Sequence, residues 1–286
     1  MSADNPVLDD VDGWGQIGLS QAYAQVERLT VPLALELLKR IENPGNLSRL
    51  DIKVHDNGCG IGAMTNALKS SYPRLQVHAT DASAGMCDVV NTRMKQEEWL
   101  NVTTEIADSR SLSQIDDDWF DYTFSTFMIC LAPEPHRIAQ EMNRVTKPGG
   151  ILALAVWADP WFSYLSDPWT KACKQVDARY ERLRIMNENW TDPEQVKAGL
   201  QEAGFKDVVL VTEKWPWTWA SSEEFIDYFI EGGNPGNQRQ IDAWNVLGRS
   251  VDEVRPIFKR VVESDYGQPD GQIKGYVPAH LVTARK

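Results

Sequence analysis

Short runs of β-branched and other apolar residues alternate with longer stretches of helical periodicity between about residues 50 and 157. Such short apolar runs favour buried strands, and helical stretches between them favour a parallel sheet with helices on both faces. The predicted strands are residues 52–55, 76–80, 103–106, 120–126 and 151–156, and the predicted helices are residues 63–72, 83–98 and 136–145. The pattern therefore predicts the α/β class, with residues 147–150, Lys-Pro-Gly-Gly, as the turn into the fifth strand.

The second half of the chain is predicted to interrupt this sheet. Asp192, followed by a proline, and Ser221 are helix N-cap candidates. Residues 207–213 are predicted as a sixth strand, residues 214–271 as mainly helical, and residues 276–285 as a last strand. The expected organisation is an N-terminal helical cap over residues 1–49, a cofactor-binding sheet domain made of residues 50–213 and 274–286, and a helical lid inserted as residues 214–273.

Composition bounds the partners of this 286-residue chain. Its formal net charge of −12 disfavours a nucleic-acid partner, because phosphate backbones bind clustered basic surfaces. The acidic, polar N-terminus has no signal-peptide pattern, and no apolar run approaches a membrane-spanning length. We therefore expect a cytoplasmic protein with a small-molecule substrate and no membrane partner. The oligomeric state is left open.

Four cysteines lie far apart, with no Cys-x-x-Cys pair and no histidine at metal-ligand spacing. The sequence therefore predicts neither a metal site nor a disulfide framework. Cys59 alone stands in a candidate ligand site, where a small side chain in a crowded turn is favoured over a reactive thiol.

Residues 54–63, Val-His-Asp-Asn-Gly-Cys-Gly-Ile-Gly-Ala, carry the strongest chemical signal. Alternate glycines let a backbone turn tightly from strand to helix and approach a ligand closely. Gly58, Gly60 and Ala63 alone would also fit a dinucleotide fingerprint, but Asp56 would repel a pyrophosphate and attract a cationic ligand. S-adenosylmethionine carries an ammonium and a sulfonium, so it fits better. The alternative is a purely structural turn in which Asp56 caps the next helix.

Polar residues follow the next two predicted strands, where ligands bind in open α/β sheets. Asp81 lies 19 residues after Gly62, close to the spacing at which an acid accepts hydrogen bonds from a ribose. Met86, one turn into the following helix, can lie against an adenine, although core packing competes. Asp108 and Ser109 can serve the adenine amino group and ring nitrogens, the alternative being a solvated loop. Residues 125–128 would line the methionine end of the cofactor, with the choice among them left open.

Together these motifs resemble class I S-adenosylmethionine-dependent methyltransferases over about residues 50–157. The matching motifs are Asp56-x-Gly58-x-Gly60-x-Gly62, Asp81-x-Ser83-x-x-Met86, Ala107-Asp108, Phe120-Asp121-Tyr122 and residues 144–150, Arg-Val-Thr-Lys-Pro-Gly-Gly. The resemblance implies a Rossmann-like, mostly parallel sheet of seven strands with an antiparallel last strand, and a helical lid.

The resemblance also implies a cofactor site. Asp56 and the backbone of Gly58 and Gly60 would hold the methionine portion, Asp81 would bind the ribose hydroxyls, and Met86, Asp108 and Ser109 would enclose the adenine. The full set of implied cofactor-binding residues is Asp56, Gly58, Cys59, Gly60, Asp81, Ala82, Met86, Asp108, Ser109, Phe127, Tyr23 and Arg28.

A narrower likeness is to small-molecule methyltransferases of fungal secondary metabolism, including thiol methyltransferases that act on dithiol diketopiperazines. It rests on residues 56–63, on residues 97–102, Glu-Glu-Trp-Leu-Asn-Val, and on residues 265–267, Asp-Tyr-Gly. These matches suggest kinship and not a shared substrate.

Tryptophan is concentrated in the region expected to cover the methyl group. Eight of eleven fall there: Trp157, Trp161, Trp169, Trp190, Trp215, Trp217, Trp219 and Trp244. A large apolar face with one donor suits a lid over a flat or apolar substrate. The alternative is that most of them pack the lid onto the sheet. Trp157 and Trp161, directly after the fifth strand, are the preferred substrate-binding residues.

An amphipathic helix over residues 19–39, bending near Pro32, is predicted to cross the site. Similar methyltransferases use an N-terminal aromatic there, so Tyr23 is a candidate to close over methyl group and substrate. Arg28 is a candidate to pair with the cofactor carboxylate. A core aromatic and a surface charge are the alternative interpretations.

Methyl transfer from a sulfonium needs alignment and exclusion of water more than a dedicated base. His136 is the one histidine after a strand's carboxyl end and, with Tyr23, is a candidate catalytic residue, whereas His55, His78 and His280 fall within strands. Without a clear base, a thiol or phenol acceptor is favoured over an aliphatic alcohol.

Two rival functions remain at this level. Gly58, Gly60 and Ala63 also allow a nicotinamide-dependent dehydrogenase, which Asp56 disfavours. The absence of a clear base allows a regulatory protein on the same fold, or an enzyme that binds the cofactor and catalyses a rearrangement.

Overall fold

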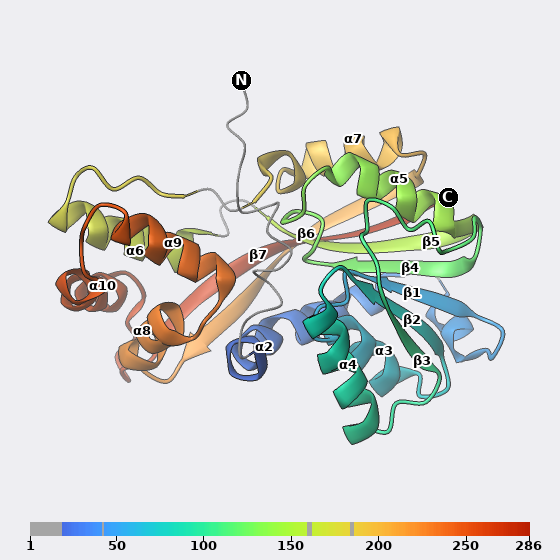
Figure 1. Cartoon of the computed structure of the whole chain (residues 1–286), viewed down its shortest axis with the longest axis horizontal. Helices are drawn as coiled ribbons and strands as arrows, with labels where there is room; N and C mark the ends of the chain where they lie inside the picture. Colours follow the sequence, from blue (N-terminus) through green and yellow to red (C-terminus); the bar gives the residue numbers. More distant parts are fainter. Residues whose placement is uncertain (1–18, 42, 159–161, 184–185) are drawn as a thin grey trace.

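The computed structural model describes residues 19–41, 43–158, 162–183 and 186–286, without the side chains of residues 19–24, 162–165 and 188. Within these residues the centre is one seven-stranded sheet with the order β3-β2-β1-β4-β5-β7-β6 (Figure 1). The strands are β1 (Lys53–Asn57), β2 (Gln76–Asp81), β3 (Val102–Ile106), β4 (Phe120–Thr126), β5 (Thr146–Trp157), β6 (Lys206–Trp219) and β7 (Ile273–Arg285).

The sheet contains parallel strands and an antiparallel last strand, as predicted. β1 to β5 pair in parallel, and β7 runs antiparallel between β5 and β6. The predictions of the α/β class, of seven strands and of an antiparallel last strand are therefore confirmed. The order reverses at β1, which lies between β2 and β4, and ligands bind at such a switch point in open α/β sheets.

Helices cover both faces of the sheet and one end of it (Figure 1). α2 (Leu19–Leu38), α3 (Ala63–Ser71) and α4 (Ala84–Gln96) lie on one face, and α5 (Pro135–Val145) and α7 (Pro193–Glu202) lie on the other. α6 (Phe162–Val176), α8 (Ser222–Glu231), α9 (Pro235–Asn245) and α10 (Val251–Tyr266) gather beside the far ends of β6 and β7. Two short 3₁₀ helices are η1 (Pro44–Ser48) and η2 (Glu188–Trp190). Among the described helices, none is both long and apolar enough to cross a bilayer.

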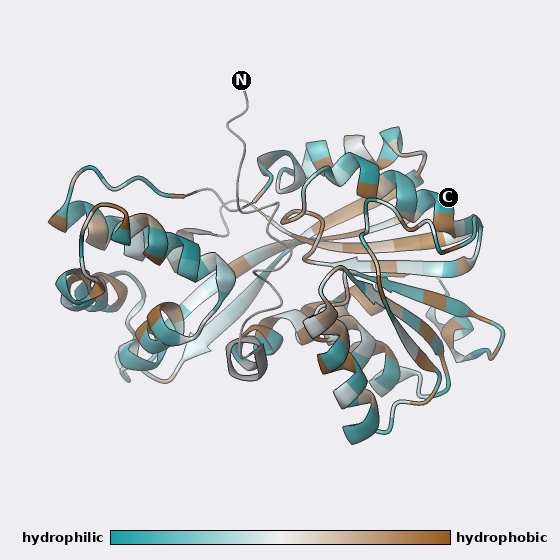
Figure 2. Ribbon diagram, viewed as in Figure 1, coloured by the Kyte–Doolittle hydropathy of each residue, from teal (hydrophilic) through white to brown (hydrophobic). Residues whose placement is uncertain are grey.

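The core follows the central strands. β4 and the second half of β5 are almost continuously buried, as expected for parallel strands covered on both faces. Figure 2 shows hydrophobic colouring along the middle of the sheet and hydrophilic colouring on the outer sides of α5 and α7. The predicted N-caps are also present: the side chains of Asp192 and Ser221 accept hydrogen bonds from backbone amides in the first turns of α7 and α8.

One element prediction is wrong. Residues 214–219, predicted as helical, continue β6 as far as Trp219 and pair with β7. The stretch Trp215-Pro216-Trp217-Thr218-Trp219 alternates aromatic and smaller residues with a period of two, which is a strand signal. Pairing along the whole of β7 satisfies its backbone groups and carries both strands out to the group of helices α6, α8, α9 and α10 (Figure 1).

Two further differences concern element ends and a missed helix. Residues 147–150, predicted as a turn, lie inside β5 but at a break in its register with β4, where Gly149 has a φ of 78°. The predicted turn is therefore present as an irregularity within β5. Helix α6 was not predicted, because Pro168 stands inside it.

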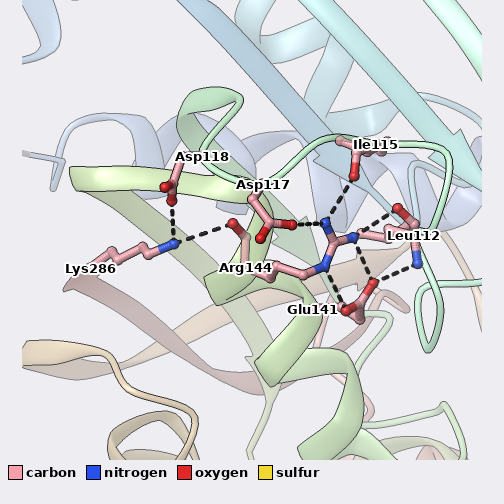
Figure 3. Close-up of polar contacts among 7 residues, drawn as sticks. All are labelled: Leu112, Ile115, Asp117, Asp118, Glu141, Arg144 and Lys286. Atoms are coloured by element: carbon pink, nitrogen blue, oxygen red, sulfur yellow. Dashed lines mark hydrogen bonds and ion pairs between the residues drawn. The ribbon is translucent and has the colours of Figure 1, made fainter.

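The connection between β3 and β4 has no helix, and Arg144 of α5 fixes it in place (Figure 3). Its guanidinium donates to the carbonyls of Leu112 and Ile115 at 2.8 and 2.9 Å and pairs with Asp117 at 2.6 Å. Glu141 binds the same guanidinium and accepts from the Leu112 amide at 2.7 Å. The loop that begins with Asp108 is thus held from its far end.

Candidate functional site

A cavity of about 260 Å³ opens at the carboxyl ends of β1, β2, β4 and β5. Its walls come from the loops after these strands and after β3, from α2, from the outer end of β6, and from α8 and the start of α9. The sheet part of the chain therefore supplies one side of the cavity, and the helical segments before and after it supply the other.

The glycine-rich loop after β1 forms the floor of the cavity. Gly58 and Gly60 have φ values of 69° and 53°, which residues with side chains rarely adopt. The amides of Gly58 and Cys59 donate to the carbonyl of Thr80 at 2.8 and 2.9 Å. A Cβ added at Gly60 would meet nothing within 4 Å, whereas one at Gly58 would lie 2.5 Å from Cγ of Met128. The backbone at Gly60 thus borders open space that a ligand can fill.

Asp81 ties the second strand to this loop. One carboxylate oxygen accepts from the Gly60 amide and the other from the Ser83 amide, both at 2.9 Å. Burial raises the pKa of the Asp81 carboxyl, and these two hydrogen bonds oppose the shift. Asp81, Ala82 and Met86 all line the cavity, so this part of the predicted site is brought together.

Asp56 lies beneath the loop and not in the cavity wall. Its side chain is fully buried, and Thr65 of α3 donates to it at 2.6 Å. Burial raises the pKa of this carboxyl to about 6. Its second carboxylate oxygen is buried and has no hydrogen-bond partner among the described residues, so binding of the ligand by Asp56 stays a prediction.

The loop after β3 brings Asp108, Ser109 and Arg110 to the cavity. Asp108 pairs with Arg110 at 2.7 Å, and this guanidinium lowers the pKa of the carboxyl. Ser109 donates to Asn57 at the end of β1 at 2.8 Å. The predicted adenine-side residues therefore share one wall, with Asp108 already bound to a neighbouring cation.

Aromatic side chains line the opposite end. The rings of Phe127, after β4, and Trp157, at the end of β5, stack with centroids 3.8 Å apart. Trp217 of β6 and Tyr228 of α8 complete this end and meet edge to face at 5.5 Å. Trp169, Trp190, Trp219 and Trp244 are instead fully buried core residues, as the alternative interpretation held.

Other predicted residues lie elsewhere. The Trp161 prediction falls outside the described residues, as does the side chain of Tyr23 in α2. Arg28 does not line the cavity: it donates to the Thr218 carbonyl at 2.9 Å and pairs with Glu224 of α8 at 3.5 Å. In this arrangement the Arg28 guanidinium links α2 to β6 and α8, and its pairing with the cofactor carboxylate stays a prediction.

The histidines are also remote. His136 packs against Trp190 with ring centroids 5.5 Å apart and has Glu202 of α7 as its acidic neighbour at 3.8 Å. His55 and His280 are buried, as expected of histidines within strands. Among the described residues no histidine lines the cavity, and a catalytic role for His136 stays a prediction.

Sequence reasoning missed a clamp that closes one side. Glu27 of α2 lines the cavity and pairs with Arg93 of α4, which also donates to the Ile61 carbonyl of the glycine-rich loop at 2.9 Å. It also did not select Trp217 or Tyr228 as site residues, and it did not predict the part of the cavity wall at the start of α9. The alternation of aromatic residues in 215–219 was the one available signal, because the other contacts join distant segments.

Comparison with known proteins identifies the class. Residues 55–154 match the family described as "Methyltransferase domain". Together with the strand order and the glycine-rich loop, this match makes the protein a class I S-adenosylmethionine-dependent methyltransferase, with S-adenosylmethionine as its cofactor. The dehydrogenase interpretation is thereby set aside.

Its curated relatives are distant. The chain is 26% identical over 221 residues to methyltransferase ktnA of Aspergillus niger, covering 68% of this chain and 72% of the relative. It is 23% identical to acetylaranotin bis-thiomethyltransferase of Aspergillus terreus over 68% of each chain. It is 26% identical to malonyl-[acyl-carrier protein] O-methyltransferase of Halorhodospira halophila, covering 89% of this chain and 80% of that one.

Solved structures share the fold. The YcgJ protein of Bacillus subtilis superposes with a TM-score of 0.56 at 17% identity, covering 91% of this chain and 98% of that one. Phosphoethanolamine N-methyltransferase 2 of Haemonchus contortus, solved with phosphomonomethylethanolamine and S-adenosylhomocysteine, also gives 0.56 at 18% identity, covering 96% of this chain and 59% of that one. The [4+2]-cyclase SpnF gives 0.51 at 20% identity, covering 98% and 91%.

Proposed function

We propose that the enzyme transfers the methyl group of S-adenosylmethionine to a thiol or a phenolic or other hydroxyl of a small secondary metabolite. The observation that carries this proposal is the composition of the cavity: a loop and carboxylates suited to the cofactor at one end, and stacked aromatic rings without a histidine at the other. When bound, the cofactor supplies an electrophilic methyl group on a sulfonium.

The roles of the cofactor-side residues follow from their placement. The open backbone at Gly60 suits the methionine portion, and Asp81 retains oxygen lone pairs for ribose hydroxyls after its two hydrogen bonds to amides. Met86 and Ser109 are positioned to enclose the adenine. Glu27 of the clamp adds a further carboxylate, which favours a cationic ligand.

The acceptor side offers apolar walls instead of a base. Phe127, Trp157 and Trp217 exclude water and align an acceptor with the methyl carbon, and alignment of this kind supplies much of the catalysis. The bound cofactor would supply the methyl group, and the acceptor sulfur or oxygen would have to give up its proton, which it can lose to solvent before the aromatic walls enclose it. Thiols and phenols lose that proton most readily, which supports them as acceptors.

The relatives support this assignment in part. One is a bis-thiomethyltransferase and another an O-methyltransferase, so both acceptor atoms occur among proteins of similar sequence. The net charge of −12 supports a small-molecule substrate over a nucleic acid.

We also propose that three parts of the chain have separate roles. Residues 1–49 act as a cap, residues 50–213 and 274–286 bind the cofactor, and residues 214–273 act as the lid. The placement of α8, α9 and α10 beside the ends of β6 and β7 supports this division (Figure 1).

Two measurements test the function. Calorimetry with S-adenosylhomocysteine should show stoichiometric binding, and incubation with methyl-labelled cofactor should label a thiol or phenol from a panel of aromatic thiols, phenols and aliphatic alcohols. Labelling of the alcohols alone would overturn the preference for a thiol or phenol over an aliphatic hydroxyl. Binding without transfer to any acceptor in the panel or in a native extract would favour a rearrangement enzyme or regulatory protein.

A further inference from the structure

The acceptor end of the cavity is poorly suited to an anion, and this observation deepens the proposed function on which it rests. Among the described lining residues the charged side chains are Glu27, Asp81, Asp108 and Arg110. The single cation among them, Arg110, binds Asp108 at 2.7 Å and lies 3.4 Å from Glu134. Glu27 is paired with Arg93, and Asp81 is hydrogen-bonded only to backbone amides. Asp81 is therefore the one carboxylate among these lining residues without a cationic partner, and Arg110 is already engaged, so a phosphate or carboxylate on the acceptor would find no available cation there.

The same end is shaped by flat side chains. Phe127 and Trp157 stack with an interplanar angle of 22°, and Trp217 stands on the wall formed by β6. Aromatic rings recognise other rings by stacking and edge-to-face contacts in addition to the area they bury. This wall fits an aromatic acceptor better than a short aliphatic one.

One polar group of the lid faces this aromatic end. Tyr228 of α8 is 6% exposed and lines the cavity, and Asn234, the residue before α9, lines it as well. The Asn234 carbonyl oxygen accepts from the amides of Gly236 and Asn237 at 3.0 and 3.3 Å, because Asn234 is the N-cap of α9. Its amide nitrogen is therefore the group left to donate, and a hydrogen bond from it to the Tyr228 oxygen would leave the Tyr228 proton for another acceptor.

We propose that the lid selects an uncharged aromatic acceptor, and that Tyr228, oriented by Asn234, donates a hydrogen bond to a carbonyl or similar neutral oxygen on it. Tyr228 is thus a specificity-determining residue and not a base. Phe127, Trp157 and Trp217 supply the flat surface, and the lack of an available cation disfavours anionic analogues of the same shape.

Three naphthalene probes separate these contributions in calorimetry with protein saturated with S-adenosylhomocysteine at about pH 7. Methyl 6-hydroxy-2-naphthoate is neutral and carries a carbonyl, 6-hydroxy-2-naphthoate is its anion, and 2-naphthol has the ring and hydroxyl alone. The ester should bind at least about tenfold more tightly than the anion, because the anion's carboxylate would lose its hydration without gaining a cationic partner. Equal or tighter binding of the anion would overturn the proposal, as would failure of every probe to bind protein that does bind S-adenosylhomocysteine.

Two variants test the hydrogen bond. Tyr228→Phe should weaken binding of the ester about tenfold and leave 2-naphthol within about twofold. Asn234→Asp keeps an N-cap residue but replaces the donor with an acceptor that would take the Tyr228 proton, so it should weaken the ester similarly. Tyr276→Phe, at an exposed position on β7, is the matched control.

The outcomes distinguish a failure of the role proposed for Tyr228 from a failure of the proposed function. An equal loss for ester and 2-naphthol in Tyr228→Phe, or no loss for either, would show that Tyr228 only packs the lid. Failure of the unmodified protein to bind S-adenosylhomocysteine would overturn the proposed function itself.

Discussion

The carboxylate of Asp81 accepts a 2.9 Å hydrogen bond from the backbone amide of Gly60, so the end of β2 holds the loop that follows β1. Asp81 therefore shapes the site as well as lining it. The same carboxylate also fixes the start of α4 through the Ser83 amide. Removing it would disturb the loop and the ribose position together.

Replacement of the Asp81 carboxylate should separate its role in holding the loop from its role in binding the ribose. Asp81→Ala should weaken S-adenosylhomocysteine binding by on the order of 100-fold in calorimetry, since charge-assisted hydrogen bonds to a sugar and to amides are lost. Asp81→Asn keeps one acceptor oxygen and should lose less. Asp88→Ala, at an exposed position on α4, controls for the loss of an acid from this region. An unchanged affinity in Asp81→Ala would contradict the placement of the ribose.

The buried carboxyl of Asp56 should make stability depend on pH. Its folded-state pKa is raised from 3.8 to about 6, mainly by burial, so its stabilising contribution is present below about pH 4 and is lost as pH rises through 6. Asp56→Asn lacks this dependence. Urea unfolding of both proteins checks this. Between about pH 4 and 7, the free energy of unfolding of the variant should rise by about 3 kcal/mol relative to that of the unmodified protein.

Asp88→Asn carries the same change in charge at an exposed position and serves as the control for the Asp56 experiment. A constant difference between Asp56→Asn and the unmodified protein across this pH range would show that the Asp56 carboxyl is not desolvated.

The two loop glycines should tolerate alanine differently. Both have positive φ values, so each alanine costs about 1 to 2 kcal/mol of backbone strain. Gly58→Ala adds a clash with Cγ and Cβ of Met128 at 2.5 and 2.8 Å, whereas Gly60→Ala meets open space. Thermal unfolding should therefore show a larger loss of stability for Gly58→Ala. Gly60→Ala should instead lose more S-adenosylhomocysteine affinity relative to its loss of stability. The reverse ranking would contradict the loop geometry.

The loop after β3 should depend on Arg144 (Figure 3). Arg144→Lys retains a charge but cannot serve Leu112, Ile115 and Glu141 at once, because an ammonium lacks the planar fork. We expect a loss of about 2 kcal/mol in the free energy of unfolding and faster hydrogen exchange over residues 107–119.

The control for this loop experiment is Arg74→Lys, which makes the same exchange at an exposed position. Unchanged exchange over residues 107–119 in Arg144→Lys would show that other contacts hold the loop.

Local sequence patterns were sufficient to predict most of the helices and strands and the cofactor end of the site. Periodicity, N-caps such as Asp192 and the glycines at 58 and 60 act over a few residues, so their structural consequences can be read without the fold. Asp81 and Ser109 could be placed in the cavity for a related reason: parallel strands end at one edge of a sheet, and residues just after them gather there.

Tertiary structure alone decided which side chains reach the cavity. Asp56, one strand position before the loop, is turned inward beneath it, and Arg28 and His136 are directed to other helices. The acceptor end joins Phe127, Trp157, Trp217 and Tyr228 from four separate segments. Their meeting depends on how far β6 and β7 extend and where the lid helices pack against them. Such long-range packing leaves no periodicity in the sequence around any one of these residues.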